Sequence, residues 1–164
     1  MYDTIVVGTD GSSTAAKAVE HAAALSALTH ADLHIAMATP SIPMLVAPDM
    51  VIATAEWDTA TEQATRTALR AAAALATSAG VEATTHQLAG DPADALLSLC
   101  DDLDADLLVV GSRGIHGARR FLLGSVSSRC AHHADRSVLI VHTGSHTGSH
   151  TGSHTGSHTN SLDD

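Results

Sequence analysis

The 164-residue chain has few basic residues, few aromatic residues and little cysteine. Lysine and arginine together number 8 against 18 aspartates and glutamates, so the formal net charge at pH 7 is -10. Nucleic acids and acidic membrane faces are bound through clustered positive charge, and we therefore expect neither as a partner. The two cysteines, Cys100 and Cys130, lack the close spacing of a metal site, and we expect them to be buried and reduced.

Long hydrophobic runs are also missing. No apolar run approaches the roughly 20 residues that a membrane-spanning helix needs, and the N-terminus begins a strand instead of a signal peptide. We therefore expect a cytoplasmic protein. The single lysine, Lys17, and the excess of aspartate over glutamate favour a halophilic surface that stays hydrated in a salt-rich cytoplasm. An ordinary acidic protein is the alternative.

What the chain does contain is a regular alternation of apolar strands and alanine-rich helices. The strands are apolar on both faces, which is typical of a parallel sheet covered by helices on both sides, and right-handed crossovers make this a doubly wound α/β fold. Thr59 and Glu62 have the spacing of a capping box at the start of the second helix, and Asp91 and Pro92 begin the third. We expect strands at residues 2–8, 32–38, 81–88, 106–111 and 138–142, and helices at about 12–28, 59–80, 91–103 and 125–133.

The composition changes abruptly after His142. Residues 143–158 are four copies of Thr-Gly-Ser-His, and residues 159–164 complete the chain. This stretch has too little apolar surface to offset its ordering entropy, so we expect one domain at residues 1–142 and a disordered tail at 143–164. The tail histidines either bind a transition metal loosely or have no role. They are His146, His150, His154 and His158.

The strongest functional pattern is a glycine-rich loop after the fourth strand. Gly111 and Gly114 are followed, nine residues later, by Gly124 and Ser125 at the start of a helix. Glycines let backbone N–H groups approach an anion closely, and the helix N-terminus adds free N–H groups and a positive dipole end. The pattern therefore predicts a phosphate cradle, with a plain tight turn as the alternative. Five of the eight cations fall nearby, at Arg113, Arg119, Arg120, Arg129 and Arg136.

A second polar turn, Thr9-Asp10-Gly11, follows the first strand. In a doubly wound sheet, ligands bind beyond the carboxyl ends of the strands where the winding reverses, and the ends of the first and fourth strands should be neighbours there. The carboxylate of Asp10 would accept a hydrogen bond from a ribose hydroxyl or an adenine amine, or hold a magnesium-bound water. Alternatively, Asp10 only caps the next helix.

These motifs resemble those of the universal stress protein family over residues 1–142. The resemblance rests on the Val7–Ser12 strand tip, the Gly90-Asp91-Pro92 helix start, the 106–111 strand, the glycine loop and the 137–141 strand. It implies the strand order 3-2-1-4-5. The glycine loop has the form seen in members of the family that bind ATP, and members that do not bind ATP lack this glycine pattern. The resemblance also implies a homodimer through the strand Val138 to Val141.

The resemblance further implies an adenine nucleotide site. Gly111, Gly114, Gly124 and Ser125 would hold the phosphates and ribose with Val110 and Val126 beside them, Thr9 and Asp10 would approach the adenosine, and Ala38 would line the adenine pocket. Arg113 would help to bind the phosphates, and the expected cofactor is ATP with magnesium. The implied role is that of a nucleotide-dependent stress-response regulator.

Two other functional classes stay open. A slow magnesium-dependent ATPase or phosphotransferase would use the same pocket, with His116 as a base, although no Gly-x-x-x-x-Gly-Lys-Ser/Thr loop is present. A metal-buffering or scaffold protein would act through the histidine tail. Nucleotide binding is better supported by the sequence than turnover is.

Overall fold

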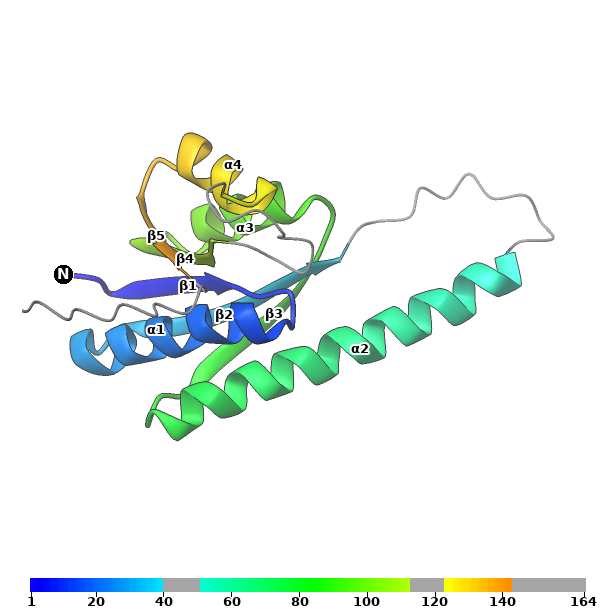
Figure 1. Ribbon diagram of the computed structural model, residues 1–164, viewed down its shortest axis with the longest axis horizontal. Coiled ribbons are helices and arrows are strands. Elements are labelled where there is room, and N and C mark those ends of the chain that lie inside the picture. Colours follow the sequence, from blue (N-terminus) through cyan, green and yellow to red (C-terminus); the bar gives the residue numbers. More distant parts are fainter. Residues whose placement is uncertain (40–50, 113–122, 143–164) are drawn as a thin grey trace, which may run out of the picture.

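The structure, a computed structural model, describes residues 1–39, 51–112 and 123–142, with the backbone alone at 51–59. Strands and helices alternate along these residues (Figure 1). The strands are β1 (Thr4–Gly8), β2 (Asp32–Thr39), β3 (Ala83–Ala89), β4 (Leu107–Gly111) and β5 (Ser137–Val141). The helices are α1 (Ser13–Thr29), α2 (Val51–Ser78), α3 (Pro92–Asp102) and α4 (Ser125–His133).

The strands form one five-stranded sheet in the order β3-β2-β1-β4-β5, and every pairing is parallel. The predicted fold class and strand order are therefore confirmed. The register places Val7 of β1 between Ile35 of β2 and Val109 of β4. The winding reverses at β1, which lies at the centre of the sheet, so the carboxyl ends of β1 and β4 are neighbours.

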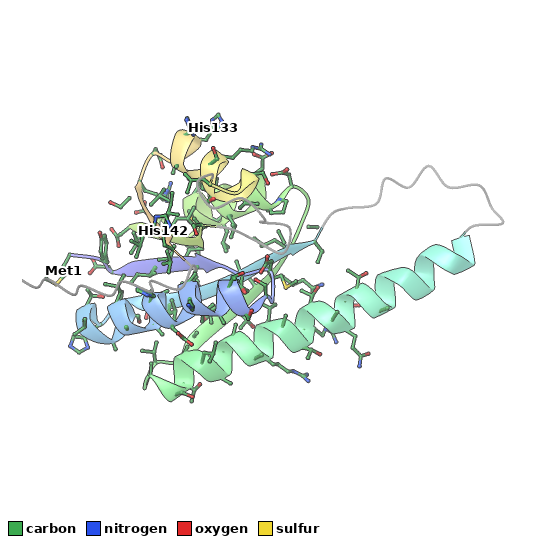
Figure 2. All side chains as sticks on the ribbon, in the orientation of Figure 1. Met1, His133 and His142 are labelled. Atoms are coloured by element: carbon green, nitrogen blue, oxygen red, sulfur yellow. The ribbon has the colours of Figure 1, made fainter. Side chains whose placement is uncertain are left out.

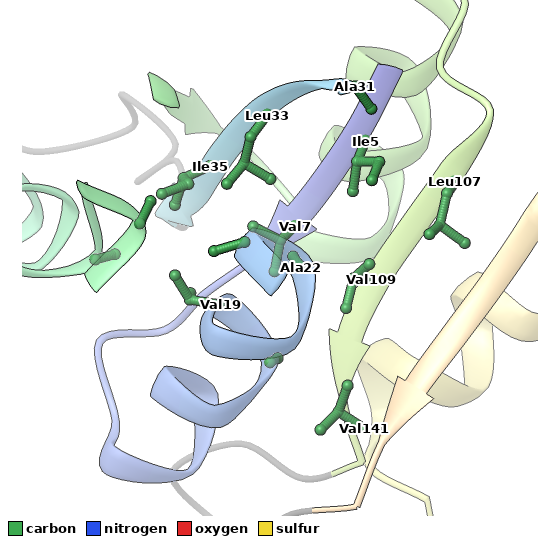
Figure 3. Close-up of a cluster of buried hydrophobic side chains, with 14 of the residues drawn as sticks. Ile5, Val7, Val19, Ala22, Ala31, Leu33, Ile35, Leu107, Val109 and Val141 are labelled. Atoms are coloured by element: carbon green, nitrogen blue, oxygen red, sulfur yellow. The ribbon is translucent and has the colours of Figure 1, made fainter. Parts of the chain in front are cut away.

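Alternate residues of the central strands supply two separate cores. Ile5 and Val7 point into a core closed by α1 and α2, to which Leu33, Ile35, Leu107 and Val109 also belong (Figure 3). Val6 points to the opposite face, into a core closed by α3 and α4 that includes Ala36, Leu108, Cys100 and Cys130. All three β1 residues are 0% exposed, which explains why the strand reads as a continuous apolar run.

Side chains cap the N-termini of two helices, and the predicted cap of α3 is confirmed. The hydroxyl of Ser12 accepts a hydrogen bond from the Ala15 N–H at the start of α1. The carboxylate of Asp91 accepts from the N–H groups of Ala93 and Asp94 at the start of α3. Both side chains satisfy N–H groups that have no partner within their helix. The expected buried and reduced state of the cysteines is also found, since Cys100 and Cys130 are both free and buried.

The predicted start of α2 is wrong. This helix begins at Val51, so Thr59 lies inside it and does not cap it. The residues between 51 and 59 include no proline or glycine that would interrupt a helix, and a capping-box spacing can occur within one. The helix ends at Ser78, close to the predicted stop at Gly80, which has a φ of 78°.

The predicted tail at 143–164 lies outside the described residues, so its disorder stays a prediction. Among the residues that the structure describes, no helix is both long and apolar enough to cross a membrane.

Candidate functional site

The candidate site lies at the carboxyl edge of the sheet, where β1 and β4 end side by side. Strand pairing runs from Ile5 and Leu107 to Val7 and Val109, and both strands end in glycine, at Gly8 and Gly111. The topology therefore brings together two turns that are about a hundred residues apart in the sequence. The predicted juxtaposition of the two strand ends is confirmed.

The turn after β1 is held by its own side chains. The Thr9 N–H donates to the Ala36 carbonyl of β2 at 2.9 Å, and the Gly11 N–H donates to the Thr9 hydroxyl at 3.2 Å. Oδ1 of Asp10 accepts from both the N–H and the hydroxyl of Ser12, at 3.0 and 2.6 Å. Asp10 thus orders the turn that leads into α1, whereas the cap of that helix is Ser12.

Glycine is required at position 11 for two reasons. Its φ is 76°, in the left-handed region that side chains disfavour. A Cβ there would also lie 3.0 Å from the Cβ of Ala68 on α2. The turn is therefore packed closely between the end of β1 and the middle of α2.

The loop after β4 is closed at its base by hydrogen bonds. The Ser112 N–H donates to the Val141 carbonyl at the end of β5, at 2.8 Å. The Ser112 carbonyl accepts from the Gly124 N–H at 2.9 Å, so the two ends of the loop between residues 112 and 124 meet in one hydrogen bond. The hydroxyl of Ser127 donates to the same Ser112 carbonyl and to the Gly124 carbonyl, at 3.3 and 3.1 Å.

Helix α4 begins directly at this closed base. Its N-cap is Gly124, with φ -64° and ψ 162°, and no side chain of the described residues forms a capping hydrogen bond there. Ser125 is exposed, whereas Val126 is half-buried against the core under α3 and α4. A helix N-terminus that is preceded by glycine and lacks such a cap suits an external anionic acceptor.

The remaining predicted residues either lie near the carboxyl edge of the sheet or fall outside the residues that the structure describes. Val110 is buried in the core beneath Gly111, and half-buried Ala38 lies near the end of β2 opposite Leu88 of β3. Arg113, Gly114 and His116 lie outside the described residues, as do Arg119 and Arg120. Their predicted roles therefore stay predictions.

Two of the five clustered arginines, Arg129 and Arg136, form ion pairs within the fold. Arg129 of α4 pairs with Asp91 and Asp94 of α3, at 2.7 and 2.6 Å. Arg136 pairs with Asp101 and Asp135 and donates to the Cys100 and Ala105 carbonyls. Because Arg136 precedes β5, it lies at the amino edge of the sheet, opposite the candidate site.

Sequence reasoning missed three residues that shape the site. A Cβ on Gly8 would lie 2.7 Å from Cδ1 of Leu96, so this glycine lets α3 pack against the end of β1. Ser112 and Ser127 are buried, at 3% and 2% exposure, and join the two ends of the loop. For Ser127 the sequence offered one signal. This serine lies three residues before Cys130, on the buried face of an otherwise polar helix.

Histidines do not assemble into a metal site within the described part of the chain. No group of three or more His, Cys, Asp or Glu side chains there is placed to hold a metal ion. His133 at the end of α4 and His142 after β5 are both exposed (Figure 2).

Comparison with known proteins places this geometry in a family. The model of the Universal stress protein family matches residues 1–142. Universal stress protein Rv1636 of Mycobacterium tuberculosis is 36% identical over 146 residues, which are 87% of this chain and 97% of that protein. Universal stress protein MJ0531 of Methanocaldococcus jannaschii is 31% identical over 144 residues, covering 86% of this chain and 82% of that protein.

Solved structures agree with the sequence matches. A universal stress protein crystallised in complex with cAMP is 36% identical, with a TM-score of 0.66 over 87% of this chain and 98% of that one. The universal stress protein UspA from Lactobacillus plantarum, at 19% identity, shows the same fold with a TM-score of 0.75 over 86% of this chain and 99% of that one. The chain therefore belongs to the universal stress protein family.

Proposed function

We propose that this protein binds an adenine nucleotide across the carboxyl ends of β1 and β4. The observation that carries the proposal is the hydrogen-bonded closure of the loop base, which joins the start of α4 to the end of β4, the strand paired with β1. Phosphate oxygens would accept from backbone N–H groups of the loop and the first turn of α4. The adenosine would lie toward Thr9, Asp10 and Ala38.

The ligand of a relative supports the adenine part of this proposal. The cAMP complex is that of a universal stress protein that is 36% identical to this chain, and the match covers 98% of that protein. For this chain we propose ATP with magnesium as the ligand, because its glycine loop has the form seen in ATP-binding members of the family. Gly111, Gly114, Gly124 and Ser125 would bind the phosphates and ribose, with Arg113 assisting and Val110 and Val126 flanking them.

The residues that the structure describes fit such a ligand. None of their side chains caps the first turn of α4, and Gly124 and Gly111 are partly accessible. Asp10 already binds Ser12 through one carboxylate oxygen, which orients the side chain at the tip of β1. Magnesium would be held by the phosphates and water, since the described residues supply no cluster of carboxylates for it.

We propose that the protein acts as a dimeric, nucleotide-dependent regulator in the cytoplasm. The strand β5 lies at one edge of the sheet, and Val138, Leu139 and Ile140 are half-buried. An apolar edge strand is suited to pairing with a second copy of itself. Light scattering at several protein concentrations, with and without ATP, tests this part, and a constant monomer mass would contradict it.

The nucleotide proposal is tested by calorimetric titration of magnesium-ATP into the wild-type protein and the Gly124→Val variant. We expect saturable binding near one nucleotide per chain in the wild type and none in the variant, because a branched side chain would occupy phosphate space. The φ and ψ of Gly124 are accessible to valine, so the variant should keep its fold and melting temperature.

Leu123→Ala provides the matched control, because Leu123 is the exposed neighbour of Gly124. This variant should bind ATP as the wild type does. Normal ATP binding by Gly124→Val would show that the site is wrongly placed. Titrations with cAMP and GTP would establish the preferred phosphate chain and base, and phosphate release above a protein-free control would favour the ATPase alternative.

A further inference from the structure

Ser127 is a buried polar residue whose side-chain hydrogen bonds both lead to the loop base. It is the third residue of α4 and is 2% exposed. Its hydroxyl lies 3.3 Å from the Ser112 carbonyl oxygen and 3.1 Å from the Gly124 carbonyl oxygen. One carbonyl belongs to the end of β4 and the other to the start of α4, so a single hydroxyl proton is shared between the two ends of the loop.

These contacts reinforce the backbone bond between the same two ends. The Ser112 carbonyl also accepts from the Gly124 N–H, and the Gly124 carbonyl also accepts from the Ser128 N–H, each at 2.9 Å. Each carbonyl thus has one backbone donor and shares Ser127 as a second. The Ser112 N–H is in turn bound to the Val141 carbonyl of β5, which fixes the first end of the loop to the sheet.

We propose that Ser127 is a positioning residue for the phosphate chain of the bound nucleotide. By tying Gly124 to Ser112, it sets the separation between the end of β4 and the first N–H groups of α4. A loop base held in its binding geometry before the ligand arrives lowers the cost of ordering those N–H groups around phosphate. This inference rests on the proposed nucleotide site and adds a residue that touches no part of the nucleotide.

The proposal predicts an effect confined to phosphate. The turn that would meet adenosine is ordered by Thr9, Asp10 and Ser12 and makes no described contact with Ser127. Loss of the Ser127 hydroxyl should therefore weaken the binding of ATP and leave the binding of adenosine unchanged. A side chain that only stabilised the fold would change the affinity for both ligands together.

The test measures dissociation constants for magnesium-ATP and for adenosine in the full chain and in two variants. Ser127→Ala removes the buried hydroxyl, and Ser128→Ala makes the same substitution at the next position of the same helix. The Ser128 contact with Gly124 comes from its backbone N–H and survives the substitution. We expect Ser127→Ala to weaken ATP binding about tenfold. A loss of this size corresponds to one hydrogen bond at the upper end of its usual net contribution. Adenosine affinity should stay within about twofold, and Ser128→Ala should match the wild type for both ligands.

Other outcomes would overturn the inference. Equal ATP affinity in Ser127→Ala and Ser128→Ala would show that the hydroxyl does not position the loop. An equal loss of affinity for ATP and for adenosine in Ser127→Ala would show a general structural role. If wild-type protein does not bind ATP, the proposed function itself fails and this inference with it. Ser127→Cys retains a side chain of similar shape with a much weaker donor, and it carries the same test should the alanine variant fail to fold.

Discussion

The imidazole rings of His34 and His86 meet across the neighbouring strands β2 and β3. Nδ1 of His34 lies 2.9 Å from Nε2 of His86, and the ring centroids are 5.1 Å apart. One ring must donate and the other accept, so the bond is lost when both rings are fully protonated. Partial burial and the charge of His34 lower the pKa of His86 below its ordinary value of 6.5.

The lowered pKa of His86 predicts a loss of stability in mild acid. Because the folded protein disfavours the charged ring, the unfolded chain binds more protons at pH values between the lowered pKa and 6.5. The contribution to stability is complete above pH 6.5 and is lost as the pH falls through this window. The measurement is the free energy of unfolding in urea at about pH 7.5 and about pH 5.5, on either side of the ordinary histidine pKa.

Two variants isolate the pair in this experiment. His86→Gln should flatten the pH dependence, whereas His133→Gln, which changes an exposed histidine, should leave it unchanged. Asp91 and Asp106 also have lowered pKa values, but from an ordinary value of 3.8, so they lose their contribution only in stronger acid. A pH dependence that persists in His86→Gln would contradict the assignment.

At the scale of elements, α3 packs directly against the end of β1, at the edge of the candidate site. A Cβ on Gly8 would lie 2.7 Å from Cδ1 of Leu96, and 3.6 Å from Cγ1 of Val110. The ion pairs from Arg129 to Asp91 and Asp94 then join α3 to α4, whose N-terminus belongs to the proposed site. The packing of α3 therefore affects both sides of the proposed nucleotide.

Gly8→Ala should destabilise the protein by about 1–3 kcal/mol, the usual cost of overpacking a core. Gly8 has no positive φ, so the cost comes from the contact with Leu96 and not from backbone strain. Urea unfolding of a double-mutant cycle separates these causes. The cost of Gly8→Ala should shrink in a Leu96→Ala background, which provides room, and stay unchanged in a Leu99→Ala background. Equal costs in all three backgrounds would rule out the steric explanation.

At the scale of the whole molecule, the chain places a strongly negative charge around two apolar cores. The net charge is -10, and several of the few cations are committed to ion pairs, among them Arg66, Arg129 and Arg136. The remaining acidic groups repel one another across the surface, and added salt screens this repulsion. The halophilic surface predicted from composition is a property of this scale, and no single residue carries it.

Lowering KCl from molar to millimolar concentration should therefore lower the melting temperature. The physical reason is unscreened repulsion in the compact state, which unfolding relieves. A repeat of the salt series near the isoelectric point serves as the control, because the dependence should become smaller as the net charge approaches zero. Equal melting temperatures at both KCl concentrations at neutral pH would contradict a salt-adapted surface.

Short-range patterns in the sequence were enough to predict the fold class, most element boundaries and the cap of α3. The buried apolar run from Ile5 to Val7 identifies a strand, and the Asp91-Pro92 pair identifies a helix start, without reference to distant residues. Topology rules then predicted that the ends of β1 and β4 lie together. The early start of α2 escaped prediction because a capping-box spacing can occur inside a helix.

The partners of the polar and charged groups, in contrast, became evident only in the folded chain. Arg129 and Arg136 follow the glycine loop in sequence, yet they pair with Asp91, Asp94 and Asp101, because folding brings α3 and its N-cap residue beside them. Gly8 and Ser127 likewise owe their roles to Leu96 and Ser112, which are distant in the chain. Local sequence encodes the conformation of each segment, whereas the partner of a buried or charged group depends on how separate segments pack.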